Sequence, residues 1–217
     1  MLRDELSALA ARVAGMLPAE ASATIERGIA ALALAGNHAP RPGDAIPAFA
    51  LPDATGAAVT SATLLARGPL LLVFYRGEWC PYCNLLLRAL QSRLAEIAAA
   101  GATLVAISPQ LPEVSWSMAR RLALGFPVLS DAGNEVAASF GLRFALDAEH
   151  RALYAGFGVD LASSNGDDSA TLPLAAAFLV GADGIVREAR VETDYRQRAE
   201  PDELIGWARR HAAGAAR

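Results

Sequence analysis

The feature that most restricts the fold of this chain is a pair of cysteines, Cys80 and Cys83, that follows an apolar run at residues 69–75. The run is too short for a membrane-spanning helix, which needs about 20 apolar residues, so we predict a buried strand at 70–75. Pro81 suits the first position of a helix, because the N–H that proline lacks is not used there. We therefore predict a strand followed by a helix that begins beside the cysteines.

A mostly parallel sheet is expected around this unit. The helix is predicted to run from 81 to about 100, where Gly101 can end it, and a second buried strand is predicted at 102–107. Alternating strands and helices of this kind indicate a parallel sheet. Residues 176–180 and 185–191 are predicted to complete it as an antiparallel hairpin. The predicted fold class is therefore α/β, with a central mixed sheet flanked by helices.

Capping and turn residues predict the remaining elements. These are an edge hairpin at 49–56, a strand at 125–130 after a helix containing Trp116 and Leu122, a helix at 134–140 capped by Asp131, a helix near 147–154, a loop at 163–169 and a last helix from Pro201 to about 211.

The first 36 residues are predicted to form a helical extension. Apolar side chains recur at helical spacing from Leu2 to Leu32, and Pro18 divides the segment into two helices. Residues 36–44 are rich in turn-forming residues and mark a linker. We therefore divide the chain into an N-terminal extension at 1–36 and a main domain at 40–214.

Charge and composition exclude several classes of partner. The formal net charge is −4 and the sequence has no run of lysine or arginine, so we expect no nucleic-acid partner and no membrane partner. Acidic residues stand near the N-terminus where a secretory signal would carry basic ones. A lone Cys-x-x-Cys without such a signal indicates redox chemistry in the cytoplasm.

The position of Cys80 at the start of a helix predicts a reactive thiol. The partial positive charge of a helix N-terminus favours the thiolate, which is the reactive form. Cys83 lies one turn further along the same face, close enough for an intramolecular disulfide. Apolar residues continue the face from Cys83, so we expect Cys80 to be the exposed attacker and Cys83 the shielded resolving cysteine.

Three neighbouring residues are candidates for a substrate-binding site. Arg76 supplies a positive charge near the sulfurs, while Trp79 and Tyr82 would shield the sulfurs and form an apolar contact surface. Each of the three could instead serve only in packing or at the surface.

Two other interpretations of the cysteine pair were weighed against redox chemistry. The cysteines could be inert buried thiols. They could also form half of a zinc or copper site, but such a site needs further soft ligands, and the three histidines are distant in sequence: His38, His150 and His211. We therefore favour redox chemistry and expect neither a metal nor another cofactor.

Residues 74–84, Phe-Tyr-Arg-Gly-Glu-Trp-Cys-Pro-Tyr-Cys-Asn, resemble the peroxiredoxin-like branch of the alkyl hydroperoxide reductase and thiol-specific antioxidant (AhpC/TSA) family. Segments at 106–110, 126–131, 172–174, 182–186 and 194–198 agree with this resemblance. It covers about residues 40–210 and implies a thioredoxin-like fold.

The resemblance leaves the attacking cysteine open. Peroxiredoxins carry a Pro-x-x-x-Thr-x-x-Cys motif after this strand, and alignment on residues 74–75 places its proline on Arg76, its threonine on Cys80 and its peroxide-attacking cysteine on Cys83. Alignment on Trp79 and Cys80 instead resembles thioredoxin and glutaredoxin, in which Cys80 would attack. The two alignments name different nucleophiles.

A second departure from the family concerns the arginine that steadies the thiolate. Peroxiredoxins place this arginine about three residues before the phenylalanine that corresponds to Phe178, and thioredoxins place a cis-proline nearby. This chain has Ala175 there, with Pro173 close by. Peroxide activation would lack its usual arginine unless Arg76 or Arg198 takes that place.

The resemblance implies an antioxidant thiol peroxidase, in which Cys80 and Cys83 cycle between dithiol and disulfide and a thioredoxin-type donor restores the dithiol. The local motif supports an alternative, a thiol-disulfide oxidoreductase acting on protein or small-molecule disulfides. A third hypothesis is a redox-gated binding module without turnover. Because thioredoxin-fold peroxidases commonly pair through sheet edges or loops, a homodimer is also among the expectations.

Overall fold

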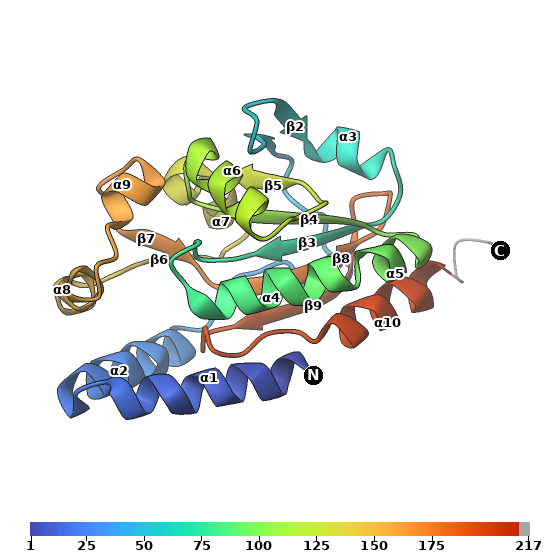
Figure 1. Cartoon of the computed structure of the whole chain (residues 1–217). Coiled ribbons are helices and arrows are strands. Elements are labelled where there is room, and N and C mark those ends of the chain that lie inside the picture. The colour runs from blue at the N-terminus through green and yellow to red at the C-terminus, as the bar shows by residue number, and fades with distance from the viewer. Residues whose placement is uncertain (213–217) are drawn as a thin grey trace.

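A five-stranded mixed sheet lies at the centre of the chain, which is seen here in a computed structural model that describes residues 1–212 (Figure 1). The strand order is β5-β4-β3-β8-β9. The strands are β3 (Leu70–Phe74), β4 (Thr103–Ser108), β5 (Val128–Ser130), β8 (Ala175–Val180) and β9 (Val186–Glu192). β4 is parallel to β3 and β5, whereas β8 is antiparallel to β3 and β9. The predicted mixed α/β sheet and its closing hairpin are confirmed.

The central strand β3 is buried on both faces, which explains its unbroken apolar sequence. Side chains alternate between the two faces of a strand. Leu71 and Val73 therefore enter the core that also contains Cys83. Leu72 and Phe74 enter the core on the opposite face. The sheet thus separates two apolar cores, and the cysteines belong to one of them.

Helices cover both faces of the sheet. The face with the cysteines packs against α4 (Pro81–Ser92), α5 (Leu94–Ala99), α10 (Pro201–Ala212) and two side chains of α6 (Pro112–Arg121) (Figure 1). The opposite core includes residues of α3 (Ser61–Leu65) and α7 (Glu135–Ser139). No helix within residues 1–212 is long and apolar enough to cross a membrane.

The predicted single helix from 81 to about 100 is wrong, because the structure divides it into α4 and α5. The break lies at Arg93, whose φ of −114° and ψ of 12° depart from helical values. The Arg93 side chain contacts the carboxylates of Glu96 and Asp202, and the latter belongs to α10. The break therefore coincides with a contact between helices.

The N-terminal segment forms the two predicted helices, α1 (Leu2–Met16) and α2 (Ala19–Ala35), with Pro18 between them. α1 buries Leu2, Leu6 and Leu9 in the core that also contains α4. The extension is therefore packed onto the cysteine-bearing face of the sheet.

α2 packs against α8 (Ala148–Gly156), near one end of the molecule (Figure 1). Gly28 permits this contact, because a Cβ at this position would overlap the ring of His150. The domain division at residues 36 and 40 stays a prediction, and its end at residue 214 lies outside the described residues.

Smaller elements complete the chain. They are the edge hairpin of β1 (Ala50–Pro52) and β2 (Ala58–Thr60), the pair β6 (Arg143–Ala145) and β7 (Thr171–Pro173), the short 3-10 helix η1 (Ala132–Asn134) and α9 (Leu161–Asn165). Asp131 accepts hydrogen bonds from the backbone amides of Val136 and Ala137, so the predicted cap of α7 is confirmed.

The prediction of a loop at 163–169 is wrong at its start, because α9 extends to Asn165. Asp160 caps α9 by accepting a hydrogen bond from the backbone N–H of Ser163 at 2.9 Å. A capping carboxylate three residues earlier can outweigh the turn-forming composition of such a segment.

Candidate active site

The two cysteines lie where the chain leaves β3 and enters α4. Cys80 is the N-cap residue of α4 and Pro81 occupies the first helical position, as the sequence predicts. The amides of Cys83 and Asn84 both donate to the Cys80 carbonyl, at 3.1 Å each, and close the first turn. This turn places both thiols on the buried side of the helix.

The expected difference in exposure between the cysteines is absent. Both are free thiols, with Cys80 1% exposed and Cys83 fully buried. The prediction that Cys80 is exposed is therefore wrong. The prediction fails because the sequence pattern indicates which face of α4 is buried, but not which other elements cover the N-terminus of the helix.

Arg198 provides a cation beside Cys83. Its Nη2 donates to Cys83 Sγ at 3.3 Å, and its Nη1 donates to the carbonyls of Tyr195 and Gln197. The side chain is 7% exposed, in the connection between β9 and α10. The backbone contacts hold the guanidinium at the sulfur.

The small side chain at Ala175 explains how Arg198 reaches this place. Ala175 on β8 and Arg198 line the same small cavity, together with Val73 of β3 and Leu86 of α4. Ala175 stands where the resemblance predicts an arginine, and its methyl group leaves room beside the sheet. Arg198 therefore enters from another segment of the chain.

The surroundings of the two sulfurs shift the pKa values of the two thiols in opposite directions. Burial alone would raise the pKa of Cys83, but a hydrogen bond from Cys80, the charge of Arg198 and the backbone amide of Arg76 lower it well below the ordinary value. Burial and the hydrogen bond to Cys83 raise the pKa of Cys80 well above the ordinary value. These surroundings favour the thiolate at Cys83 over Cys80, whereas the helix N-terminus alone would favour it at Cys80.

Arg76 lies in a cage of aromatic rings. Its guanidinium carbon is 4.9 Å from the ring centre of Trp79, 5.4 Å from that of Tyr154 and 4.1 Å from that of Tyr195. Its Nη2 donates to the hydroxyl of Tyr154. The charge of Arg76 lowers the pKa of Cys80 and Cys83 against the larger effect of burial, and its role in substrate binding stays a prediction.

Trp79 and Tyr82 join this aromatic cluster from the turn before α4 and from its first residues. Trp79 packs on Tyr154 with ring centres 5.5 Å apart, and Tyr82 meets Tyr195 edge-on at 5.6 Å. A Cβ at Gly77 would overlap the Trp79 ring, so the turn requires glycine there. All five predicted site residues are thus brought together.

Sequence reasoning did not identify the residues that brace the turn. The backbone N–H of Glu78 donates to Gln110 Oε1 at 2.9 Å, and Asn84 Nδ2 donates to the Glu78 carbonyl at 2.7 Å. Gln110 in turn donates to Ser164 Oγ at 3.1 Å. Gln110 lies within a segment that carries the family resemblance, but its contact with residue 78 spans 32 positions and has no local signal.

No group of three or more histidine, cysteine, aspartate or glutamate side chains within residues 1–212 is placed to hold a metal ion. The arrangement at the cysteines instead has the parts of a thiol redox site. It combines a cysteine whose surroundings lower its pKa, a second cysteine beside it and two buried arginines.

Comparison with known proteins gives the family of this chain. The sequence profile of the AhpC/TSA family matches residues 42–189. The chain belongs to the AhpC/TSA family. The resemblance of residues 74–84 to this family is therefore confirmed. The predicted thioredoxin-like fold of a peroxiredoxin-like family member is also confirmed.

Among relatives of this AhpC/TSA member, peroxiredoxin Bcp of Escherichia coli K12 is 25% identical over 177 residues, covering 78% of this chain and 96% of Bcp. The crystal structure of peroxidoxin BcpB from Mycobacterium tuberculosis has a TM-score of 0.62 at 24% identity, covering 79% of this chain and 97% of BcpB.

Relatives from Mycobacterium tuberculosis whose names place them among the peroxiredoxins are 36% identical over 100 residues, which is 46% of this chain. The matched stretch spans 63% of the length of these curated relatives.

Proposed function

We propose that this chain is a thiol peroxidase in which Cys83 is the attacking thiolate. The observation that carries the proposal is the contact of 3.3 Å between Arg198 Nη2 and Cys83 Sγ, in a site where the pKa of Cys83 is lowered and that of Cys80 raised. Family membership and the names of the relatives support the same reaction class.

The reaction begins with attack by the Cys83 thiolate on a hydroperoxide oxygen. The O–O bond breaks, Cys83 becomes a sulfenic acid, and the alkoxide or hydroxide that leaves takes the proton of the Cys80 thiol. The Cys80 thiolate formed in this way attacks the sulfenic sulfur, a disulfide forms, and hydroxide leaves as water after protonation. Cys80 thus acts first as proton donor and then as resolving cysteine.

The proposed cycle ends when a thioredoxin-type dithiol donates two electrons and restores both thiols. A lone Cys-x-x-Cys pair is typical of a reducing compartment, and we propose the cytoplasm. The predicted homodimer stays a prediction, which light scattering after size-exclusion chromatography would measure. The predicted roles of Arg76, Trp79 and Tyr82 in substrate binding are part of this proposal.

The alternative of a thiol-disulfide oxidoreductase requires Cys80 to attack the disulfide of a partner. Its raised pKa and 1% exposure argue against that role, because the attacking thiol must be ionised and within reach of a bulky partner. The redox-gated binding module stays a prediction, and absence of turnover with both peroxide and disulfide substrates would favour it.

The matched variants Cys83→Ser and Cys80→Ser test the proposal. Each reduced protein is treated with one equivalent of hydrogen peroxide, and dimedone traps sulfenic acid for peptide mass spectrometry. We expect sulfenic acid at Cys83 in Cys80→Ser and none at Cys80 in Cys83→Ser. Sulfenic acid formed only at Cys80 would assign the attack to the other cysteine, and turnover of insulin disulfides without peroxide reduction would replace the proposed function.

A further inference from the structure

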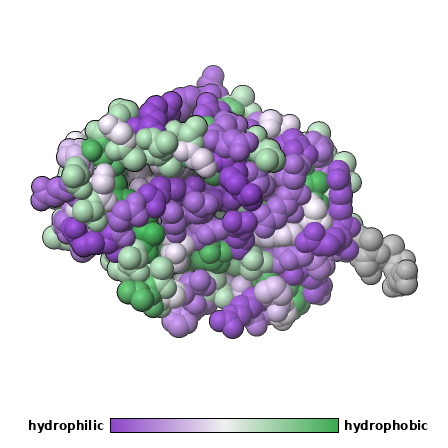
Figure 2. All heavy atoms as spheres, turned by 90° about the horizontal axis from the view of Figure 1, so that it is seen from below, coloured by the Kyte–Doolittle hydropathy of each residue, from purple (hydrophilic) through white to green (hydrophobic). Residues whose placement is uncertain are grey.

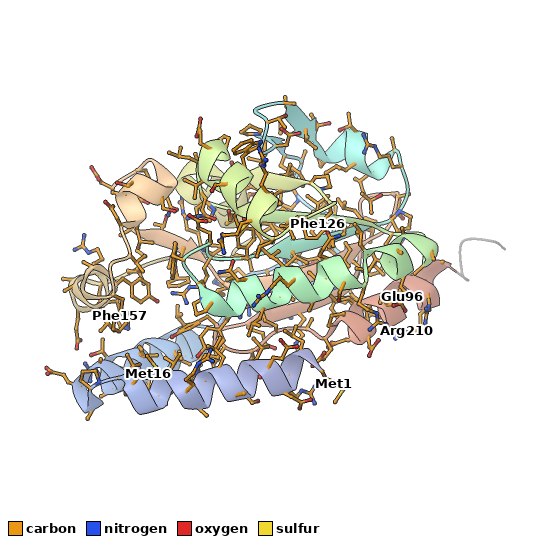
Figure 3. The ribbon with its side chains drawn as sticks, in the orientation of Figure 1. Met1, Met16, Glu96, Phe126, Phe157 and Arg210 are labelled. Carbon is orange, nitrogen blue, oxygen red and sulfur yellow. The ribbon has the colours of Figure 1, made fainter. Side chains whose placement is uncertain are left out.

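A cavity of about 270 Å³ lies between α2, α8 and the segment around β6, beside the redox site. Its walls are mostly apolar, with side chains from Ile25, Ile29, Leu32, Phe144 and Leu146. Figure 3 labels Phe157, which follows α8, and Met16, which ends α1, at this same end of the molecule. The face seen from below shows hydrophobic residues on this side (Figure 2).

Arg76 gives this apolar cavity a charged end. The side chain lines the cavity together with Tyr154 and Tyr195, and Arg76 is only 2% exposed. Three aromatic rings lie against its guanidinium, and one Nη donates to Tyr154. The Nε atom is buried without a hydrogen-bond partner. One donor of this permanently charged cavity-lining residue is therefore unused.

The buried charges around the redox site do not balance. Within the described part of the chain, Arg76 and Arg198 contact a tyrosine hydroxyl, backbone carbonyls and Cys83, but no carboxylate. The Cys83 thiolate supplies one negative charge for two guanidiniums. Leaving a buried charge unpaired is costly, and a guanidinium cannot relieve that cost by losing its proton.

His150, another polar side chain of the cavity wall, is already engaged. Its Nδ1 contacts Asp147 at 2.8 Å, and its Nε2 lies against Gly28, where an added Cβ would overlap the ring. An apolar cavity with a buried guanidinium in its wall matches a ligand that has an apolar body and one polar head.

We propose that the cavity binds an aliphatic monocarboxylate of medium chain length, with its carboxylate on Arg76 and its alkyl chain along α2. A planar carboxylate suits the N–H groups on the edge of a guanidinium, and the anion would supply the missing negative charge. The volume is near the lower end of ligand cavities, about 300 Å³, which favours a medium chain over a long one. The inference concerns binding to the reduced protein and does not rest on the proposed peroxidase reaction.

Titration calorimetry of the reduced full chain tests the proposal with three probes at 150 mM sodium chloride. Octanoate has both head and tail, octanol has the tail alone, and acetate has the head alone. We expect saturable one-to-one binding of octanoate and binding of octanol and acetate at least about tenfold weaker, the scale of a lost hydrogen bond to a charged group.

Two matched variants on α2 locate the ligand. Ala31 and Ala30 are both exposed, but only Ala31 lines the cavity. We expect Ala31→Phe to weaken octanoate binding at least about tenfold by filling the cavity and Ala30→Phe to leave it unchanged. Arg76→Met, checked for folding by circular dichroism, is expected to remove the preference for octanoate over octanol.

Three outcomes would overturn the proposal. They are the absence of saturable octanoate binding, equal affinity for octanoate and octanol, and equal loss of binding in Ala31→Phe and Ala30→Phe. Peroxide reduction is assayed separately and without any carboxylate, so a failure of the proposed reaction and a failure of this binding site are distinguishable.

Discussion

Arg198 Nη2 lies 3.3 Å from Cys83 Sγ, although 115 positions separate the two residues in the chain. The contact places a fixed positive charge on a sulfur that is fully buried. In such a place a charge acts through little solvent, so its effect on thiol ionisation is large. A residue outside the cysteine motif therefore contributes to the lowered pKa of Cys83.

Replacement of Arg198 by methionine is expected to raise the pKa of Cys83 by about one unit or more, because an opposite charge at this distance favours the thiolate. Below the raised pKa more of the thiol stays protonated, so peroxide reactivity there should fall, by up to about tenfold for a shift of one unit. Absorbance of the thiolate at 240 nm against pH, in a Cys80→Ser background, measures the shift. Arg198→Lys keeps the charge and should retain part of the effect, and an unchanged pKa in Arg198→Met would contradict the assignment.

In the alignment on residues 74–75, Cys80 takes the threonine position of the peroxiredoxin motif, which suggests a pair of nearly isosteric replacements. Cys80→Thr keeps a hydrogen-bond donor beside Cys83, so the low pKa of Cys83 and sulfenic acid formation should persist while the intramolecular disulfide is lost. Cys80→Val lacks the donor and should raise the pKa of Cys83. Thiolate titration and mass spectrometry of the oxidised proteins separate the two results. Equal pKa values in both variants would show that the donor has no influence.

Ala175 and Arg198 line one small cavity, so their side chains compete for space. Ala175→Arg alone is expected to lower the free energy of unfolding by about 1–3 kcal/mol through overpacking, or more because a second charge is buried. The double variant, Ala175→Arg with Arg198→Ala, should relieve the competition. It should also recover part of the lowering of the Cys83 pKa that is lost in Arg198→Ala alone. Urea unfolding and thiolate titration measure both effects. The idea that the two positions are equivalent would be refuted if the double variant were as unstable as Ala175→Arg and its Cys83 pKa were the same as in Arg198→Ala.

The N-terminal extension contributes to stability through the apolar face of α1. Leu6 is 5% exposed in the core that contains α4, whereas Met16 is 76% exposed. Leu6→Ala is expected to lower the free energy of unfolding by about 2–4 kcal/mol, and Met16→Ala to change it by less than about 0.5 kcal/mol. Urea unfolding followed by far-ultraviolet circular dichroism measures both. Similar values for the two variants would mean that α1 does not stabilise the main domain.

Elements built on local patterns could be predicted from the sequence. The unbroken apolar run of β3, Pro81 at the start of α4 and the turn between β8 and β9 each carry their signal within a few residues. The interruption at Arg93 could not be predicted, because it coincides with ion pairs to Glu96 and to Asp202 of a distant helix.

The location of the candidate site could be predicted, but its electrostatics could not. Proximity to a helix N-terminus favours Cys80 as the thiolate, and that local argument omits the burial of both thiols and the approach of Arg198. The absence of an arginine at Ala175 was visible in the sequence. The sequence offers Arg76 and Arg198 as candidates for that place, but the contact of Arg198 with Cys83 depends on the path of the segment between β9 and α10, which no short-range pattern encodes.

Because Cys80 and Cys83 are buried, access of an oxidant to either sulfur depends on the size of the oxidant. A reagent can reach either sulfur only when the covering side chains move aside, so its observed rate is the product of the open fraction and the rate in the open state. A bulky reagent needs a wider opening than a small one. Each additional 1.4 kcal/mol of free energy for that wider opening slows the bulky reagent about tenfold relative to the small one. Selectivity for small oxidants would then come from the free energy of opening, and stabilising the cover would sharpen it.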